Sequence, residues 1–236
     1  MMTCLCDAFY AGVAEATVRV LEAAGCQVHV PEDQTCCGQP AFNGGDFESS
    51  RRVAQHTAKV FGGELPVIVP SGSCAAMHLH GNGLQFESEP DEAQAGVRSL
   101  AGRTWEVCDF LLHGLGKTTW PGRLDKRIAI HDSCHTRGSG TGVAMRTLLG
   151  SIAGVELVEI GQAEQCCGFG GTFSVTFPHI STGMGTVKLD EVLAKEPDML
   201  VSGDMSCLMH LNGLAENQGR AVPHRHAVEL LAEVLT

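Results

Sequence analysis

The segments QTCCGQPAF (34–42) and EQCCGFGGTFS (164–174) each place two adjacent cysteines directly before a glycine. Adjacent cysteines do not readily form a relaxed disulfide with each other, because a disulfide needs a wider Cα separation than one peptide unit provides. We therefore expect each Cys-Cys pair to bind something other than its own neighbour.

The spacing of the other cysteines shows that the two pairs belong to an internal repeat. Cys4 precedes Cys36 by 32 residues, and Cys134 precedes Cys166 by the same 32. Downstream, one further cysteine in each half follows an apolar run and a Ser-Gly and leads into Met-His and Asn-Gly-Leu; these are Cys74 and Cys207. Each half thus carries the pattern Cys…Cys-Cys-Gly…Cys. We predict three regions: a first half (1–84), a connecting segment (85–126) and a second half (127–236).

Strand-like and helix-like patterns alternate in both halves, which predicts an α/β fold of two tandem, pseudo-symmetric halves with mainly parallel sheets. The predicted strands are 26–31, 65–70, 127–131, 155–160 and 198–202. The predicted helices are 12–25, 47–63, 104–115, 143–152, 182–195 and 226–236. The cysteines then follow strand ends, where open α/β sheets bind ligands. Only Met1–Thr3 precede Cys4, so either the first strand is truncated or the true start lies upstream.

Composition excludes several classes of partner. The 236 residues include 16 Lys plus Arg against 27 Asp plus Glu, and the resulting net charge of −11 argues against binding to nucleic acid or to an acidic membrane surface. No apolar run is long enough to span a bilayer, and the first residues do not resemble a secretory signal. We therefore expect a cytoplasmic protein without a transmembrane segment, in whose reducing environment 11 cysteines indicate metal or redox chemistry.

Two kinds of thiolate-bound metal centre fit four cysteines per half: an iron–sulfur cluster or zinc. Structural zinc usually takes its ligands from C-x₂₋₄-C knuckles, which the repeated cysteines lack. In a cluster, neighbouring thiolates can each bind a different iron, and Gly38 and Gly168 allow the tight backbone turn beside them. In the second half the pattern favours a cluster. In the first half, where Gln39-Pro40 stiffens the loop, cluster and zinc remain open.

Three other features of the sequence are weaker candidates. RGSGTG (137–142), followed by a predicted helix and Glu159, is similar to a dinucleotide-binding unit but lacks the third glycine of that fingerprint. Cys6 could be an alternative ligand but has no counterpart in the second half. Four histidines near the repeated cysteines could hydrogen-bond to thiolates or carry protons, although surface or capping roles are the commoner alternative: His78, His131, His135 and His210.

Taken together, TCLCDAFY, QTCCGQPAFN, PSGSCAAM, HDSCHTRGSGT, EQCCGFGGTFSV and CLMHLNG resemble the duplicated cysteine-rich CCG domain of the lactate-utilisation protein A family. The same domain occurs in the iron–sulfur subunit of glycolate oxidase and in one of the subunits of heterodisulfide reductase. The resemblance implies a cytoplasmic electron-transfer subunit of an L-lactate-oxidising complex, which makes pyruvate together with a second iron–sulfur protein and a third partner. Such a chain would be a component of an oxidoreductase and not a complete enzyme.

The resemblance also implies the ligands, which are Cys134, Cys166, Cys167 and Cys207 for an iron–sulfur cluster and Cys4, Cys36, Cys37 and Cys74 for a cluster or zinc. Heterodisulfide-reductase relatives have a fifth cysteine per half, and the matching places here are Ser71 and Asp204. One or two ordinary [4Fe–4S] clusters are therefore expected instead of a non-cubane one. The alternatives are a zinc-stabilised scaffold or interaction subunit, a disulfide-reductase-like protein and a nicotinamide-dependent oxidoreductase.

Overall fold

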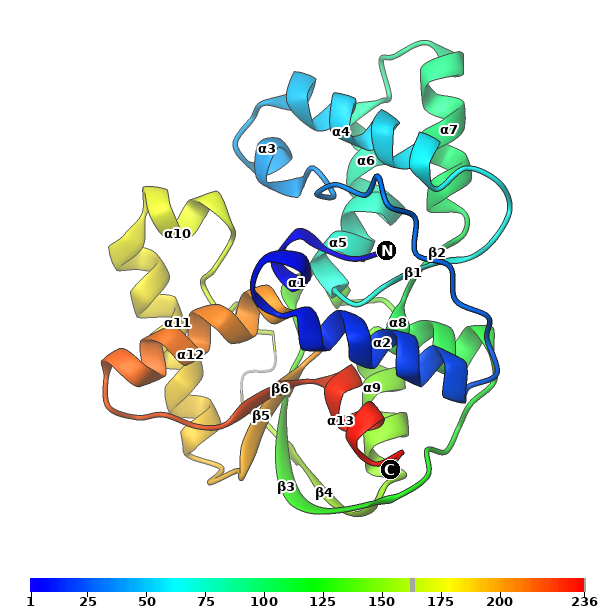
Figure 1. Cartoon of the computed structure of the whole chain (residues 1–236). Helices are drawn as coiled ribbons and strands as arrows, with labels where there is room; N and C mark the ends of the chain where they lie inside the picture. Colours follow the sequence, from blue (N-terminus) through cyan, green and yellow to red (C-terminus); the bar gives the residue numbers. More distant parts are fainter. Residues whose placement is uncertain (162–163, 236) are drawn as a thin grey trace.

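The chain folds into helices packed around two parallel β-sheets, as a computed structural model that describes residues 1–161 and 164–235 shows (Figure 1). One sheet has two strands, in the order β1-β2, and the other has four, in the order β4-β3-β5-β6. Every strand pair is parallel. The α/β class and the arrangement in two halves are therefore as predicted.

The second half contains the larger sheet. Its elements are β3 (Arg123–His131), the 3₁₀ turn η3 (Cys134–Thr136), α9 (Thr141–Gly150), β4 (Ala153–Glu159), α10 (Thr172–Thr176), α11 (Pro178–Leu193), β5 (Met199–Ser202), α12 (Met205–Asn217), β6 (His224–His226) and α13 (Ala227–Glu233). All predicted strands and helices of this half are present to within a few residues. The predicted last helix ended at Thr236, which lies outside the described residues.

Strand β3 is the centre of this sheet because its sequence is apolar on both faces. Ile128, Ala129 and Ile130 are at most 2 % exposed, a continuous apolar run that only a strand covered on both sides can bury. β4 pairs with one edge of β3 and β5 with the other, and His131 at the end of β3 aligns with Ser202 at the end of β5. The loops that follow these strands therefore lie at the same edge of the sheet.

The first half and the connecting segment contain the smaller sheet. Their elements are α1 (Cys4–Phe9), α2 (Ala11–Ala23), α3 (Gln39–Asn43), α4 (Phe47–Val60), β1 (Val67–Val69), α5 (Gly72–Ala76), the π-helical turn η1 (Met77–Gly81), α6 (Asn82–Gln85), α7 (Asp91–Ala101), β2 (Thr104–Glu106), α8 (Val107–Asp109) and the π-helical turn η2 (Phe110–Gly114). The helices predicted at 12–25 and 47–63 and the strand at 65–70 correspond to α2, α4 and β1.

The strand predicted at residues 26–31 is absent, and that prediction is wrong. In the second half the equivalent strand β4 pairs with β3, whereas none of the described residues forms a strand paired with 26–31. An apolar cavity of about 450 Å³ lies instead between residues 26–31 and β1. Isolated strands gain no ladder hydrogen bonds, so the segment stays extended without forming a sheet. Cys36 and Cys37 consequently do not follow a strand end as predicted.

The helix predicted at 104–115 is only partly correct. Its first three residues form β2, which pairs with β1, and the helical residues follow as α8 and η2. Glu106 ends the strand and caps the helix, because its Oε2 accepts hydrogen bonds from the backbone N–H groups of Cys108 (2.8 Å) and Asp109 (3.0 Å). The division at residues 84 and 126 stays a prediction.

The halves share one hydrophobic core. Helix α2 of the first half packs against α13, the last helix of the chain, as Figure 1 shows with the blue and red helices side by side. Val13, Val20 and Leu21 of α2 are buried in the same cluster as the strands β3 and β5. A smaller cluster around β1 is built by the first half together with Leu100 of the connecting segment. The fold is thus interlocked and not a pair of separate units.

Among the described residues, no helix combines the length and apolar character that crossing a membrane requires.

Candidate metal centre

All eight repeated cysteines lie at the starts of helices or in the loops before them. Cys134 begins η3 just after β3, Cys74 lies in α5 after β1, and Cys207 lies in α12 after β5. These three positions confirm the prediction that the cysteines follow strand ends. Cys4 begins α1 instead of following a strand, and the two Cys-Cys pairs lie in the loops before α3 and α10.

In the first half, four thiols form one continuous chain of contacts. Cys4 Sγ donates to Cys36 Sγ at 3.6 Å. Cys36 also accepts a hydrogen bond from Cys37, and Cys37 contacts Cys74 in turn. Residues that lie 70 positions apart in sequence are thus brought together in the order Cys4–Cys36–Cys37–Cys74.

The second half repeats this chain in the same order. The Sγ atoms of Cys134 and Cys166 are 3.9 Å apart. Cys166 accepts from both Cys134 and Cys167, and Cys167 also contacts Cys207. The structure therefore brings together each of the two four-cysteine sets that the repeat defines. All 11 cysteines of the chain are free thiols.

The thiols cannot all ionise without a positive charge between them. Hydrogen bonds from Cys37 and Cys4 lower the pKa of Cys36 to about 2, and those from Cys134 and Cys167 lower the pKa of Cys166 to about 2. The donors show the opposite effect, because hydrogen bonding to the neighbouring sulfur raises the pKa of Cys4, Cys134 and Cys167 far above the ordinary range. A metal cation bound between the thiols would favour their ionised form and displace these protons.

The two sets open into one cavity of about 360 Å³. Its lining includes all eight repeated cysteines, together with the glycine-rich loop at Gly170 and Gly171. Cys37, Cys167 and Cys207 are at most 5 % exposed, whereas Cys4 is exposed and reaches the surface. A group held here would be mostly shielded from water but accessible from one side.

A serine on a neighbouring helix holds each Cys-Cys-Gly loop in place. Ser50 Oγ of α4 donates to the carbonyl of Gly38 (3.2 Å), and Ser181 Oγ of α11 donates to that of Gly168 (2.8 Å). Both serines are at most 1 % exposed, and both glycines have positive φ, 85° and 91°. This pair was not predicted from the sequence, although the similar spacing of 12 and 13 residues after each glycine is a signal that could have found it.

The halves meet where two equivalent loops touch. Gly72 N–H donates to the Gly203 carbonyl (3.1 Å), and Ser73 N–H donates to Asp204 Oδ2 (2.8 Å). Asp204 Oδ1 accepts from the N–H and Oγ of Ser206. Asp204 therefore has both oxygens engaged: Oδ2 links the two loops, and Oδ1 caps the start of α12.

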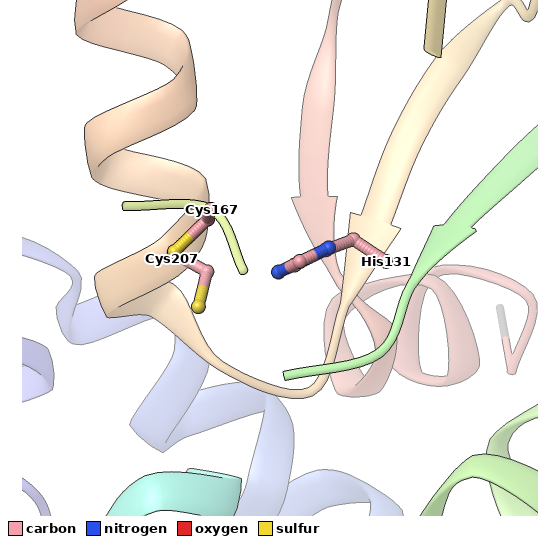
Figure 2. A group of neighbouring side chains, drawn as sticks. All are labelled: His131, Cys167 and Cys207. Carbon is pink, nitrogen blue, oxygen red and sulfur yellow. The ribbon is translucent and has the colours of Figure 1, made fainter. Parts of the chain in front are cut away.

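His131 is a further donor beside the second set, and it is the residue in Figure 2 with the two cysteines. One of its ring nitrogens, Cys167 Sγ and Cys207 Sγ all lie within 4.8 Å of one another, and all three residues are buried. A hydrogen bond from Cys167 lowers the pKa of Cys207 to about 7, and His131 lowers it as well, through a side-chain hydrogen bond and through its electrostatic effect.

His135 also lines the cavity, with Nδ1 3.7 Å from Cys134 Sγ, whereas Cys6 and the RGSGTG segment lie away from this centre or have other partners. Cys6 is 1 % exposed in the main hydrophobic core, where burial raises its pKa to about 11, and it does not line the cavity. In the RGSGTG segment, Gly140 packs against Asp109 and His113, and Glu159 accepts two hydrogen bonds from Arg146. These contacts give no support to a dinucleotide site.

The donor set fits a thiolate-bound metal. Soft sulfur ligands in fours are typical of both zinc and iron–sulfur sites. The Sγ separations of 3.6 and 3.9 Å are close to the edge of a tetrahedron of sulfurs around one zinc ion, roughly 3.8 Å from a Zn–S bond of about 2.3 Å. The cavity of about 360 Å³ is far larger than single ions require and has room for a multinuclear group.

Comparison with known proteins identifies the family of this chain. A family described as a cysteine-rich domain, CCG, matches residues 1–78 and 128–212, which include both cysteine sets. Lactate utilization protein A of Shouchella clausii is 41 % identical over 231 residues, covering 98 % of this chain and 96 % of that protein. Its namesake from Macrococcus caseolyticus is 41 % identical over 230 residues (97 % and 93 %), and Lactate utilization protein A 2 of Bacillus cereus strain Q1 is 36 % identical over 236 residues (100 % and 97 %). The chain therefore belongs to the lactate utilization protein A family, as its cysteine motifs suggest.

Proposed function

We propose that each half binds one iron–sulfur cluster through its four cysteines and that the chain is an electron-transfer subunit in L-lactate oxidation. The observation that carries the proposal is that two four-cysteine sets, with the same order of contacts, line one cavity. The names of the relatives, which refer to lactate utilization, supply the substrate.

The protein's own residues would bind and shield the clusters. Cys4, Cys36, Cys37 and Cys74 would hold the first, and Cys134, Cys166, Cys167 and Cys207 the second. When bound, such clusters take up and release single electrons. The buried members of each set exclude water, and the Ser50 and Ser181 hydrogen bonds fix the loops that carry the adjacent pairs. Asp204 keeps the two sets facing the same cavity.

The exposed side of the cavity is where an electron partner would dock. Cys4 is exposed, and Val175 of the cavity lining is 82 % exposed, so a second iron–sulfur protein could approach the first set closely. This partner, a third subunit and a cytoplasmic location complete the proposal; the chain would then be one component of an oxidoreductase.

The test is anaerobic reconstitution with iron and sulfide, followed by absorption and EPR spectroscopy. Wild type is expected to gain a brown chromophore with iron and sulfide in near-equal amounts, and Cys166→Ala to lose a large part of it. Cys26→Ala is the matched control, because Cys26 lies outside both sets and lines the other cavity. A wild-type chain that stays colourless after reconstitution would refute the proposal.

Zinc binding by a structural or interaction subunit is the second candidate. It is favoured by the Sγ separations of 3.6 and 3.9 Å and by His131 beside Cys167 and Cys207, since histidine and cysteine together are common zinc ligands. It predicts one or two zinc ions per chain, no sulfide, and unfolding by a chelator.

A further inference from the structure

His131 is a buried side chain whose ring lies beside sulfur atoms. It is 1 % exposed, and among the described residues neither ring nitrogen has a nitrogen or oxygen partner, whereas the Cys207 side chain is close enough to hydrogen-bond with the ring. Burying an imidazole nitrogen without a partner costs free energy of about 1–3 kcal/mol, so such a group usually has a function.

The backbone around His131 fixes where the ring lies. The residue ends strand β3 and pairs with Ser202 of β5, and Ser202 Oγ donates to the His131 carbonyl at 2.8 Å. Both residues are buried at the carboxyl edge of the sheet. In Figure 2 the ring reaches from the strand end toward the two cysteines, with a nitrogen at its tip.

The atoms available to this ring are sulfurs. One ring nitrogen lies within 4.8 Å of Cys167 Sγ and Cys207 Sγ, two of the four proposed ligands of the second cluster. Asp204 lies three residues before Cys207, but its two carboxylate oxygens already accept hydrogen bonds from Ser73 and Ser206. An N–H group of the imidazole thus has a thiolate as its natural acceptor once metal binding has removed the thiol protons.

The first half has no donor at the position equivalent to His131. His131 lies three residues before Cys134, and three residues before Cys4 is Met1. The amino group of Met1 is buried but donates to the Ile68 carbonyl at 2.5 Å, and its side chain carries no N–H. At this position the second set therefore has a hydrogen-bond donor that the first set lacks.

Resting on the proposed function, we infer that His131 donates an N–H···S hydrogen bond to the metal-bound thiolate of Cys207. The bond makes the second-half cluster easier to reduce than the first. A hydrogen bond to a cluster sulfur stabilises the more negative, reduced state, and such bonds are among the factors that set cluster potentials. The difference gives the electron a preferred position within the chain, on the second-half cluster. His131 would be a positioning residue that acts through Cys207.

The experiment is an EPR-monitored redox titration of the anaerobically reconstituted full chain, comparing wild type with His131→Leu and His131→Gln. Wild type should show two potentials. In His131→Leu the higher one should fall, with the reduction equilibrium about tenfold weaker, equivalent to ~59 mV for one electron. His131→Gln, which keeps an N–H donor, should restore part of the shift. The lower potential is the internal control. Iron bound in all three proteins with unchanged potentials would overturn the inference and leave the proposed function intact.

A second readout needs no variant, in case leucine at this buried position prevents folding. With ¹⁵N-labelled histidine in the wild-type chain, pulsed EPR should show a weak nitrogen coupling to the reduced cluster, as expected across a hydrogen bond. A strong coupling would mean that His131 binds iron directly, and no coupling would mean that it makes no contact; either result overturns the inference. A wild-type chain that binds no iron at all would instead refute the proposed function, and the inference with it.

Discussion

Asp204 links the two equivalent loops of the halves through one carboxylate oxygen. We predict that Asp204→Ala lowers the free energy of unfolding by about 2–4 kcal/mol, because the N–H of Ser73 would be left buried without an acceptor. Ser206→Ala is the matched control; it removes only the hydroxyl that donates to Asp204 Oδ1 and should cost about 1 kcal/mol. Urea unfolding measures both, and equal losses in the two variants would contradict the role of Asp204 as the bridge.

Glu106 is a buried acid whose protonation should make stability depend on pH. Burial raises its pKa from 4.5 to about 8, and the charges of Asp109 and Asp204 add to the effect. The folded chain then binds more protons than the unfolded chain between these two pH values, so the free energy of unfolding should fall as pH rises from 4.5 to 8. Glu106 alone can lower the free energy of unfolding by up to about 1.4 kcal/mol per pH unit.

Glu106→Gln should remove this contribution while keeping an acceptor for the N–H groups of Cys108 and Asp109. Urea unfolding at several pH values would then give a flatter profile for the variant than for wild type. The exposed Glu64→Gln is the control and should follow wild type. If the profiles of Glu106→Gln and wild type run parallel, Glu106 is not protonated in the folded chain.

At the level of single residues, the sequence identifies those that repeat and misses contacts between residues that only the fold brings together. The eight cysteines are visible because their intervals match in the two halves. Asp204 has an ordinary residue type, and its hydrogen bond to Ser73 spans 131 residues, a contact that no local pattern encodes. His131 is a candidate in the sequence only through its place near Cys134, and its neighbours Cys167 and Cys207 become evident only in the fold.

The two Cys-Cys-Gly loops provide a matched test at the level of elements. A Cβ added at Gly168 would lie 2.5 Å from the Ser181 carbonyl oxygen, whereas at Gly38 it would lie 3.3 Å from that of Ser50. Both positions have positive φ, which alone costs a non-glycine residue about 1–2 kcal/mol. We predict that Gly168→Ala lowers the free energy of unfolding by about 2–5 kcal/mol, and Gly38→Ala by only about 1–2 kcal/mol. Thermal or urea unfolding measures this, and a larger cost at Gly38 would be the contrary result.

The elements also show where sequence patterns mislead. Residues 26–31 have a strand-like sequence but form no strand, because β-structure requires a partner and none lies beside them. Conversely, β2 begins inside an apparent helix, since pairing with β1 outweighs the local pattern over three residues. Strands such as β3, whose apolar run is buried on both faces, were predictable because burial and pattern agree.

For the whole molecule, the packing of α2 against α13 makes the two halves interdependent. We predict one cooperative unfolding transition, because separating the halves would expose Val13, Val20 and Leu21 of the shared core. Trp105 reports on β2, and Trp120, whose Nε1 donates to the Leu231 carbonyl, reports on the second half. In Trp105→Phe and in Trp120→Phe, fluorescence of the remaining tryptophan should follow far-UV circular dichroism. Separate midpoints within either variant would show that the halves unfold independently.

The equivalence of the two cysteine sets is tested most directly by iron, sulfide and zinc analysis of the anaerobically reconstituted chain. Wild type is compared with Cys36→Ser/Cys37→Ser and with Cys166→Ser/Cys167→Ser. Because both sets have the same order of contacts and line the same cavity, each double variant should retain about half of the wild-type iron and sulfide, with little zinc. Stoichiometric zinc without sulfide, or a loss of iron confined to one of the two variants, would contradict a cluster in each half.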